Sequence, residues 1–183
     1  FSAALANVLL SNPEDAAVLE FTAMGPTLRF EKDTCFALAG SDFSPKLDGQ
    51  LIRSNAAGYA PAGSVLTLGS ASHGFRGYLA VAGGFAGDLV MGSRSTYTKA
   101  GLGGMQGRVL KKEDVLHCLG TEHALQQLQM RFLRTENLPF YRTGDTAVVR
   151  VLPGPQDDHF AAEGLKAFYD GVYTVTAESD RMG

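Results

Sequence analysis

Apolar positions in the first 82 residues form short runs that are separated by turn residues. Leu5, Val8 and Leu9 recur at helical spacing and Asn12-Pro13 follows them, which predicts a short helix over residues 2–10. The later runs are apolar or alternate apolar with polar residues, and they cover residues 17–21, 27–30, 35–39, 46–52, 64–68 and 76–82. Many short strands at close spacing predict an all-β barrel or sandwich.

One of the turns between these runs has a specific signature. Asp48-Gly49 lies between Leu47 and Leu51, and an Asp-Gly pair between apolar positions favours a two-residue β-hairpin. We therefore expect residues 46–52 to fold back on themselves as a hairpin.

The pattern changes after Val115. Residues 122–134 are polar, with Leu125, Leu128 and Phe132 at near-helical offsets, and Pro139 follows them. This stretch is interpreted as a connector that contains at most a marginal helix.

The last part of the chain predicts a strand, a helix and another strand. Residues 147–152 are rich in β-forming side chains and end at Pro153-Gly154-Pro155. Asp157 is expected to cap the start of a helix that ends at Gly171. The side of this helix that faces the core should carry Phe160, Leu165 and Phe168. Capping also accounts for Asp157-Asp158-His159 better than a metal site does, because acids suit a helix start. Residues 173–175 predict the second strand.

The segment from Phe75 to Arg108 concentrates glycines beside hydroxyl and arginine side chains. Glycine permits a positive φ and the close approach of another backbone or a ligand, so tight turns and a binding site both explain the segment. Ser93, Ser95 and Thr96 are possible hydrogen-bond donors, and the glycine pairs 83–84 and 103–104 expose N–H groups that could hold an anion. Forked contacts to a carboxylate or phosphate could come from Arg76, Arg94, Arg108 and Arg181.

The familiar catalytic and nucleotide motifs fail on spacing. The cluster Gly101, Gly103, Gly104 and Gly107 has Gln106 where a dinucleotide fingerprint needs glycine. The sequence has no Walker-type loop, no nucleophile elbow and no H-E-x-x-H. Its four histidines are dispersed, so no metal site is expected.

Composition narrows the class of protein. The 183 residues are 45% hydrophobic and 19% charged, as in a globular protein in water. The net charge is −3 and basic residues are scattered, which argues against a nucleic-acid partner. No apolar run approaches the ~20 residues of a membrane span, and the first residues lack the basic region of a signal peptide. Two distant cysteines, Cys35 and Cys118, indicate buried thiols and a cytoplasmic protein.

A series of collinear motifs runs through the chain. The central blocks are residues 74–84, 92–96, 103–104 and 107–108. Supporting blocks are residues 12–17, 19–20, 25–26, 40–45, 47–49, 150–156 and 179–183. In this order the blocks resemble the allophanate hydrolase subunit 2 family, which includes the C subunit of 5-oxoprolinase. The resemblance implies a mainly β chain with a cyclophilin-like β-barrel and few short helices, incomplete at both ends. Its expected domains are residues 1–118, a connector at 119–145, and the start of a second β domain at 146–183.

The resemblance also implies an activity, which is ATP-dependent hydrolysis of 5-oxo-L-proline to L-glutamate. ATP would act through a complex with partners similar to the A and B subunits of 5-oxoprolinase, and the chain alone would be inactive. The chemistry of lactam opening suggests Asp42 as a base and Ser93, Ser95 and Thr96 as donors to an oxyanion. The candidate substrate-binding residues are Arg76, Tyr78, Gly83, Gly84, Arg94, Gly103, Gly104 and Arg108.

Two other functions remain open at this point. One is the carboxyltransferase component of a biotin-dependent urea carboxylase and allophanate hydrolase system. The other is a non-catalytic regulatory module that antagonises a sporulation-kinase inhibitor. Composition and spacing do not separate these alternatives from a 5-oxoprolinase subunit.

Overall fold

A computed structural model describes residues 1–134 and 150–174 of the chain. The chain forms two compact units, Phe1–Tyr141 and Arg142–Gly183. The predicted strand residues 147–149 and 175, and the candidate Arg181, lie outside the described residues.

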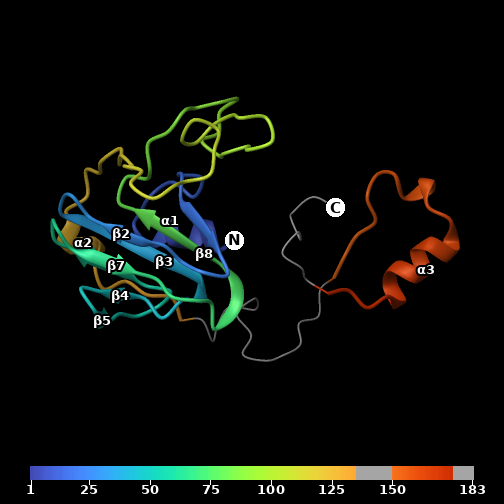
Figure 1. Cartoon of the computed structure of the whole chain (residues 1–183), viewed down its shortest axis with the longest axis horizontal. Helices are drawn as coiled ribbons and strands as arrows, with labels where there is room; N and C mark the ends of the chain where they lie inside the picture. Colours follow the sequence, from blue (N-terminus) through green and yellow to red (C-terminus); the bar gives the residue numbers. More distant parts are fainter. Residues whose placement is uncertain (135–149, 175–183) are drawn as a thin grey trace. The chain divides into compact units, whose positions relative to one another are not determined.

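Two four-stranded antiparallel sheets build the first unit (Figure 1). The first sheet has the order β1 (Leu19–Thr22), β8 (His73–Val81), β3 (Thr34–Asp42), β6 (Ala57–Ala60). The second has the order β2 (Thr27–Arg29), β7 (Val65–Thr67), β4 (Lys46–Leu47), β5 (Gln50–Leu51). The prediction of a mainly β fold with few short helices is confirmed. In the described residues the strands form two sheets and not the closed barrel that the sequence analysis expected.

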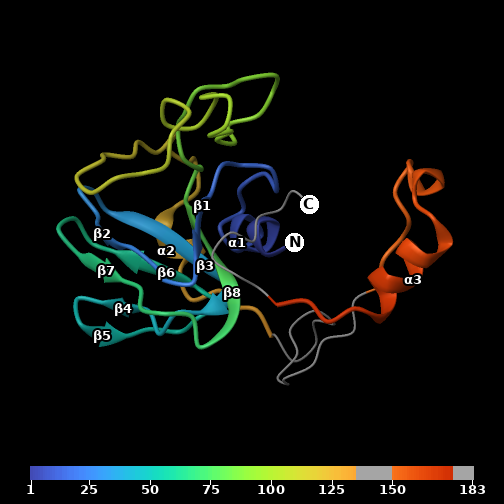
Figure 2. The ribbon, with the colours of Figure 1, turned by 45° about the vertical axis from the view of Figure 1, so that its right-hand side comes forward.

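The central strand β3 is buried on both faces. Cys35, Ala37 and Ala39 pack in one core with the helix α1 (Ser2–Leu9), and Figure 2 shows that helix beside the first sheet. The alternate residues Phe36 and Leu38 pack in the other core with Leu66 and Leu68 from the second sheet and the residue after it. Alternation of side chains along a strand therefore separates the small residues that admit a helix from the large residues that fill the space between sheets.

The hairpin predicted at Asp48-Gly49 is confirmed. Strands β4 and β5 pair Leu47 with Gln50, and both turn residues have a positive φ, 50° and 81°. That combination is the type I′ turn, whose twist matches the strands that it joins.

Strand β6 is an element that the sequence analysis missed. Its residues Ala57–Ala60 pair with β3 from Ala37 back to Thr34, although alanine and glycine are poor strand formers. Glycine is required at position 58 because the ring of Phe36 packs against it: a Cβ at Gly58 would lie 2.9 Å from the Cζ atom of Phe36.

Residues 125–133 pack against the first sheet. The single turn α2 (Leu125–Leu128) places Leu128 fully inside the core beside α1. The Ala57 N–H donates to the Arg131 carbonyl at 2.7 Å, and the Leu133 N–H donates to the Asn55 carbonyl at 2.9 Å. The sequence analysis expected at most a marginal helix in this stretch. In the structure, residues 131–133 bond to the β6 edge of the first sheet, and Leu128 packs over the core of that sheet.

The described part of the second unit contains a 3₁₀ turn, Asp157–His159, and the helix α3 (Ala162–Asp170). The prediction that Asp157 caps the helix is wrong, because Phe160 has an extended backbone (φ −104°, ψ 132°) that separates the turn from the helix. The helix ends before Gly171, as predicted. Phe160 and Phe168 are 63% and 51% exposed and not core residues. Residues 150–152 and 173–174 of the two predicted strands have no regular structure.

Within residues 1–134 and 150–174, no helix is both long enough and apolar enough to cross a membrane.

Candidate functional site

The candidate site residues fall mainly in one long loop that follows β8. We call residues 83–120 the glycine loop; it rises away from the two sheets and is drawn from green to yellow in Figure 1. Its two stems are joined by backbone hydrogen bonds. The Leu119 N–H donates to the Gly84 carbonyl at 3.0 Å, and the Ala86 N–H donates to the His117 carbonyl at 2.7 Å.

Close backbone packing explains the second glycine cluster. Gly103 and Gly104 have φ values of 70° and 53°, a region that favours glycine. A Cβ at Gly103 would overlap the carbonyl oxygen of Ser95, and a Cβ at Gly104 would overlap the Thr96 hydroxyl. The turn chemistry therefore accounts for these glycines, and it also brings Ser95 and Thr96 against them.

Ser93 and Arg94 lie at a tight turn in the same loop. Val90 and Ser93 exchange two backbone hydrogen bonds at 2.8 and 3.0 Å, and the Ser93 hydroxyl accepts the Ser95 N–H at 3.1 Å. The Nε atom of Arg94 is buried and has no hydrogen-bond partner within the described part of the chain. Three of the predicted polar residues are thus neighbours. In the described residues the Nε atom of Arg76 on β8 is likewise buried without a hydrogen-bond partner.

Arg108 is held by a carboxylate of its own loop. Its Nη1 and Nη2 atoms donate to Asp114 at 2.7 and 2.8 Å in a forked pair. The Asp114 carboxylate also accepts the Lys111 N–H at 2.7 Å. The Arg108 hydrogen bond and then the Lys111 N–H lower the pKa of Asp114 to about 2, and the same contact raises the pKa of Arg108. A substrate carboxylate would have to compete with Asp114 for this guanidinium.

Asp42, Arg76 and Tyr78 lie on the first sheet and not in the glycine loop. Asp42 pairs with His73 at the start of β8, whereas the glycine loop leaves the other end of that strand. The strand has nine residues, so eight steps separate its ends, which is roughly 26 Å at the usual rise. Asp42 accepts hydrogen bonds from the Ser44 N–H at 2.9 Å and the Ser54 hydroxyl at 2.6 Å.

The other two residues of this group are half-buried on β8. The Nε atom of Arg76 lies 4.0 Å from the Glu20 carboxylate on β1, and Tyr78 packs against the core beside α1. The structure therefore places Ser93, Arg94, Ser95, Thr96, Gly103, Gly104 and Arg108 in one loop, with Gly83 and Gly84 at its stem. It places Asp42 at the far end of β8 from that stem.

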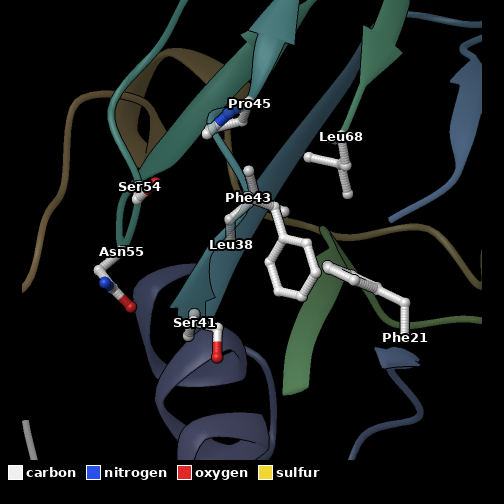
Figure 3. A pocket seen from close by; sticks show the side chains of 9 residues that line it. Phe21, Leu38, Ser41, Phe43, Pro45, Ser54, Asn55 and Leu68 are labelled. Atoms are coloured by element: carbon white, nitrogen blue, oxygen red, sulfur yellow. The ribbon is translucent and has the colours of Figure 1, made fainter. Parts of the chain in front are cut away.

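A small cavity lies beside Asp42, between the first sheet and the residues that follow β3. Figure 3 shows Phe21 and Leu68 on one side of it, with Ser54 and Asn55 on the other. Its volume of about 10 Å³ is close to the least that holds one water molecule. The cavity is therefore far too small for an amino acid or a nucleotide.

Two features of the site were missed by the sequence analysis. Asp114 follows Arg108 by six residues across a polar turn, a spacing too irregular to mark a pair. Asn12, interpreted only as a helix stop, donates to the Val81 carbonyl and accepts the Gly83 N–H, both at 2.8 Å. In the described residues no three His, Cys, Asp or Glu side chains gather as metal ligands.

Comparison with known proteins identifies the family. The sequence model described as carboxyltransferase domain, subdomain A and B, matches residues 1–183, and the chain belongs to that family. It is 35% identical over 179 residues to the C subunit of 5-oxoprolinase from Escherichia coli, covering 98% of this chain and 55% of that protein. It is 30% identical over 186 residues to urea amidolyase of Saccharomyces cerevisiae, covering 100% of this chain and 10% of that protein.

Solved structures agree with this assignment. The crystal structure of TTHA0988 matches with a TM-score of 0.68 and 32% identity, over 93% of this chain and 32% of that one. The family resemblance seen in the sequence motifs is confirmed. The chain spans about half the length of the curated 5-oxoprolinase subunits that it matches.

Proposed function

We propose that this chain is part of a subunit of an ATP-dependent 5-oxoprolinase, which opens the lactam of 5-oxo-L-proline to give L-glutamate. The observation that carries the proposal is the match to the C subunit of the Escherichia coli 5-oxoprolinase, which extends over 98% of this chain at 35% identity. The partners would be proteins similar to the A and B subunits. By the same argument, the chain by itself would be inactive.

The reaction needs activation of a stable amide. Transfer of the γ-phosphoryl group of ATP to the amide oxygen makes that oxygen a leaving group. Water then adds to the ring carbon and the C–N bond breaks, so that the nitrogen becomes the amino group of glutamate and the former lactam carbon carries an acyl phosphate. A second water hydrolyses the acyl phosphate to the side-chain carboxylate of glutamate and inorganic phosphate. Donors placed around the developing negative charge, and a cation on the substrate carboxylate, lower the barrier to such a step.

The glycine loop supplies groups of these kinds. Ser93, Ser95 and Thr96 are the proposed donors, and Arg94 is the proposed carboxylate contact because it lies between them in the loop. The Nε atoms of Arg94 and Arg76 are both buried without a hydrogen-bond partner in the described part of the chain, but Arg76 lies on β8. Gly103 and Gly104 shape the loop around them, and Arg108 joins only if Asp114 releases it. Asp42, Arg76 and Tyr78 lie elsewhere on the sheet, and their catalytic or binding role stays a prediction.

Neither ATP nor biotin fits the cavity beside Asp42, whose volume is about 10 Å³. We therefore place no phosphate or biotin contact on the residues that line it. In the proposed enzyme, the nucleotide is held by a partner subunit or at a site without a standard nucleotide motif.

A second candidate is the carboxyltransferase component of a biotin-dependent urea carboxylase. The match to urea amidolyase of Saccharomyces cerevisiae, at 30% identity over the whole chain, favours it. In that protein the matched region is only 10% of the length, whereas the 5-oxoprolinase relatives are separate and much shorter proteins. The proposal therefore ranks 5-oxoprolinase first.

Reconstitution separates the two candidates. The full-length protein is co-expressed with the products of neighbouring genes, and glutamate release from 5-oxoproline is measured with and without ATP. We expect ATP-dependent glutamate, and in the Ser93→Ala, Ser95→Ala double variant a loss of about 100-fold or more in kcat. Thr98→Ala is the matched control, because it removes an exposed hydroxyl from the same loop.

Three outcomes would count against the proposal. A complex that assembles and yields no glutamate removes the 5-oxoprolinase assignment. Biotin-dependent carboxylation of urea by the same complex supports the second candidate in its place. Unchanged kcat in the double serine variant removes the donor role of the glycine loop.

A further inference from the structure

A buried asparagine lies where the glycine loop leaves the sheet. Asn12 follows α1 in the chain and is only 9% exposed. Its Oδ1 atom accepts the Gly83 N–H at 2.8 Å, and its Nδ2 atom donates to the Val81 carbonyl at 2.8 Å. These contacts join residues that are about 70 positions apart in the sequence.

The two bonds complete the first turn of the loop. Val81–Gly84 is a β-turn closed by the Gly84 N–H on the Val81 carbonyl at 2.8 Å. Gly83, its third residue, has a φ of 85°, as a type II turn requires. The N–H of that residue has no partner within a β-turn, and Asn12 supplies one. The contact needs a donor and an acceptor on one side chain, which an amide has and a carboxylate lacks.

A second asparagine fixes the orientation of the first. Asn7 is 1% exposed, and its Oδ1 atom accepts from Asn12 Nδ2 at 3.1 Å. Its own Nδ2 atom donates to the carbonyls of Ala16 at 2.8 Å and Glu14 at 3.2 Å. The pair of amides is therefore a closed network, and such a network has one preferred arrangement when its members are buried.

The turn that Asn12 completes is bonded on both sides, to the returning stem of the loop and to the segment that follows α1. On one side, Gly84 accepts the Leu119 N–H from the returning stem at 3.0 Å. On the other side, Phe85 donates its N–H to the carbonyl of Ala17 at 3.3 Å, the residue that follows the Ala16 carbonyl bound by Asn7. The Cβ that alanine would add at Gly83 would overlap the Gly120 carbonyl, so the two stems are in direct contact there.

We propose that Asn12 is a positioning residue for the glycine loop. Its side-chain amide fixes the direction in which the loop leaves β8 and therefore the place at which Ser93, Ser95 and Thr96 are presented. The catalytic consequence rests on the proposed function, whereas the effect on the loop does not. A misplacement of about 1 Å in catalytic groups lowers turnover by about 100-fold.

Hydrogen exchange of the full-length protein tests the effect on the loop without any assay of activity. In Asn12→Ala and Asn12→Asp, amide exchange in peptides that cover residues 82–87 and 117–120 should accelerate at least tenfold. Exchange in the β3 peptide, Cys35–Ala39, should change by less than twofold. Asn55→Asp is the matched control: Asn55 accepts the Gly40 N–H at 3.0 Å on β3, opposite the middle of β8, and the same change there should leave the stems unaffected.

Reconstituted activity tests the catalytic consequence. At a temperature where the variants remain folded and still bind their partner subunits, kcat should fall at least tenfold in Asn12→Asp and by less than twofold in Asn55→Asp. If Asn12→Ala does not fold, Asn7→Ala, which keeps both Asn12 contacts to the turn, should accelerate exchange at the same peptides at least threefold.

Each of the remaining results would contradict one specific part of the proposal. Unchanged exchange at the stems, or equal acceleration in β3, removes the positioning role whatever the enzyme does. Faster exchange at the stems with unchanged kcat removes the catalytic consequence alone. A wild-type complex without glutamate release removes the proposed function and leaves the exchange result to decide the role of Asn12 in the loop.

Discussion

The Arg108 guanidinium has a partner inside the glycine loop, so its contribution to substrate binding depends on Asp114. Both oxygens of that carboxylate are engaged, at 2.7 and 2.8 Å. An arginine that is already paired with a carboxylate of its own loop stabilises the conformation of that loop in the absence of substrate. Arg94, whose Nε atom has no hydrogen-bond partner within the described residues, is the better candidate for a direct contact.

The pKa of Asp114 provides a test of this pairing. Its folded-state value of about 2 lies below the ordinary 3.8, so the ion pair stabilises the loop above about pH 4 and the stabilisation is lost as the pH falls through 2. In Arg108→Gln, the midpoint of the Asp114 carboxyl in an NMR titration should rise toward 3.8. Arg94→Gln changes the same residue type in the same loop and should leave the midpoint near 2. A midpoint that stays near 2 in Arg108→Gln would show that another group sets it.

At the scale of elements, residues 125–133 are part of the first unit and not a loose link. Leu128 is completely buried, and removing its side chain leaves a cavity beside α1. Leu128→Ala should therefore lower the free energy of unfolding of the first unit by about 2–5 kcal/mol. The measurement is denaturant unfolding of the full chain followed by a signal from that unit.

The neighbouring Gln127 provides the control for this measurement, because it is exposed in the same short helix. Gln127→Ala should change the free energy of unfolding by about 0.5 kcal/mol or less. Equal effects of the two substitutions would mean that α2 does not contribute to the core.

The sequence predicted the strands whose large apolar residues alternate, and it predicted the hairpin from Asp48-Gly49. It did not predict β6, since alanine and glycine form a strand there only because Phe36 and residues 131–133 flank it. The glycine clusters were visible as turn chemistry. Their fixed contacts were not, because Asn12 and Gly83 are 71 positions apart in the sequence and are brought together only by the tertiary fold. The separation of Asp42 from the glycine loop likewise follows from the direction of β8, which no local motif records.

At the scale of the whole molecule, the two cysteines report on different states of the protein. Cys35 is fully buried, its Sγ atom donates to the Leu125 carbonyl at 3.1 Å, and burial raises its pKa. Cys118 is exposed in the returning stem of the glycine loop, so the prediction of two buried thiols is wrong for this residue. Partial burial raises the pKa of Cys118 as well, so exposure and not pKa distinguishes the two thiols. A thiol reagent should modify Cys118 directly in the native protein, and Cys35 only at the rate at which the first unit opens.

Denaturant separates these two phases further. The slow phase should accelerate in parallel with global unfolding, while the fast phase stays nearly constant. Cys118→Ser should abolish the fast phase and leave the slow one. Rapid modification of both cysteines in the native state would contradict the burial of Cys35 beneath α2.

The contact between Cys35 and Leu125, together with the cover that Leu128 gives, also has a consequence during synthesis. A ribosome adding about 5–20 residues per second needs roughly 5–20 s to proceed from residue 35 to residue 128. From residue 60 onward, which is most of that interval, both β3 and β6 have been made and the segment that covers them has not. The growing chain therefore offers chaperones an uncovered sheet edge for several seconds, and the interval closes only when α2 emerges and docks.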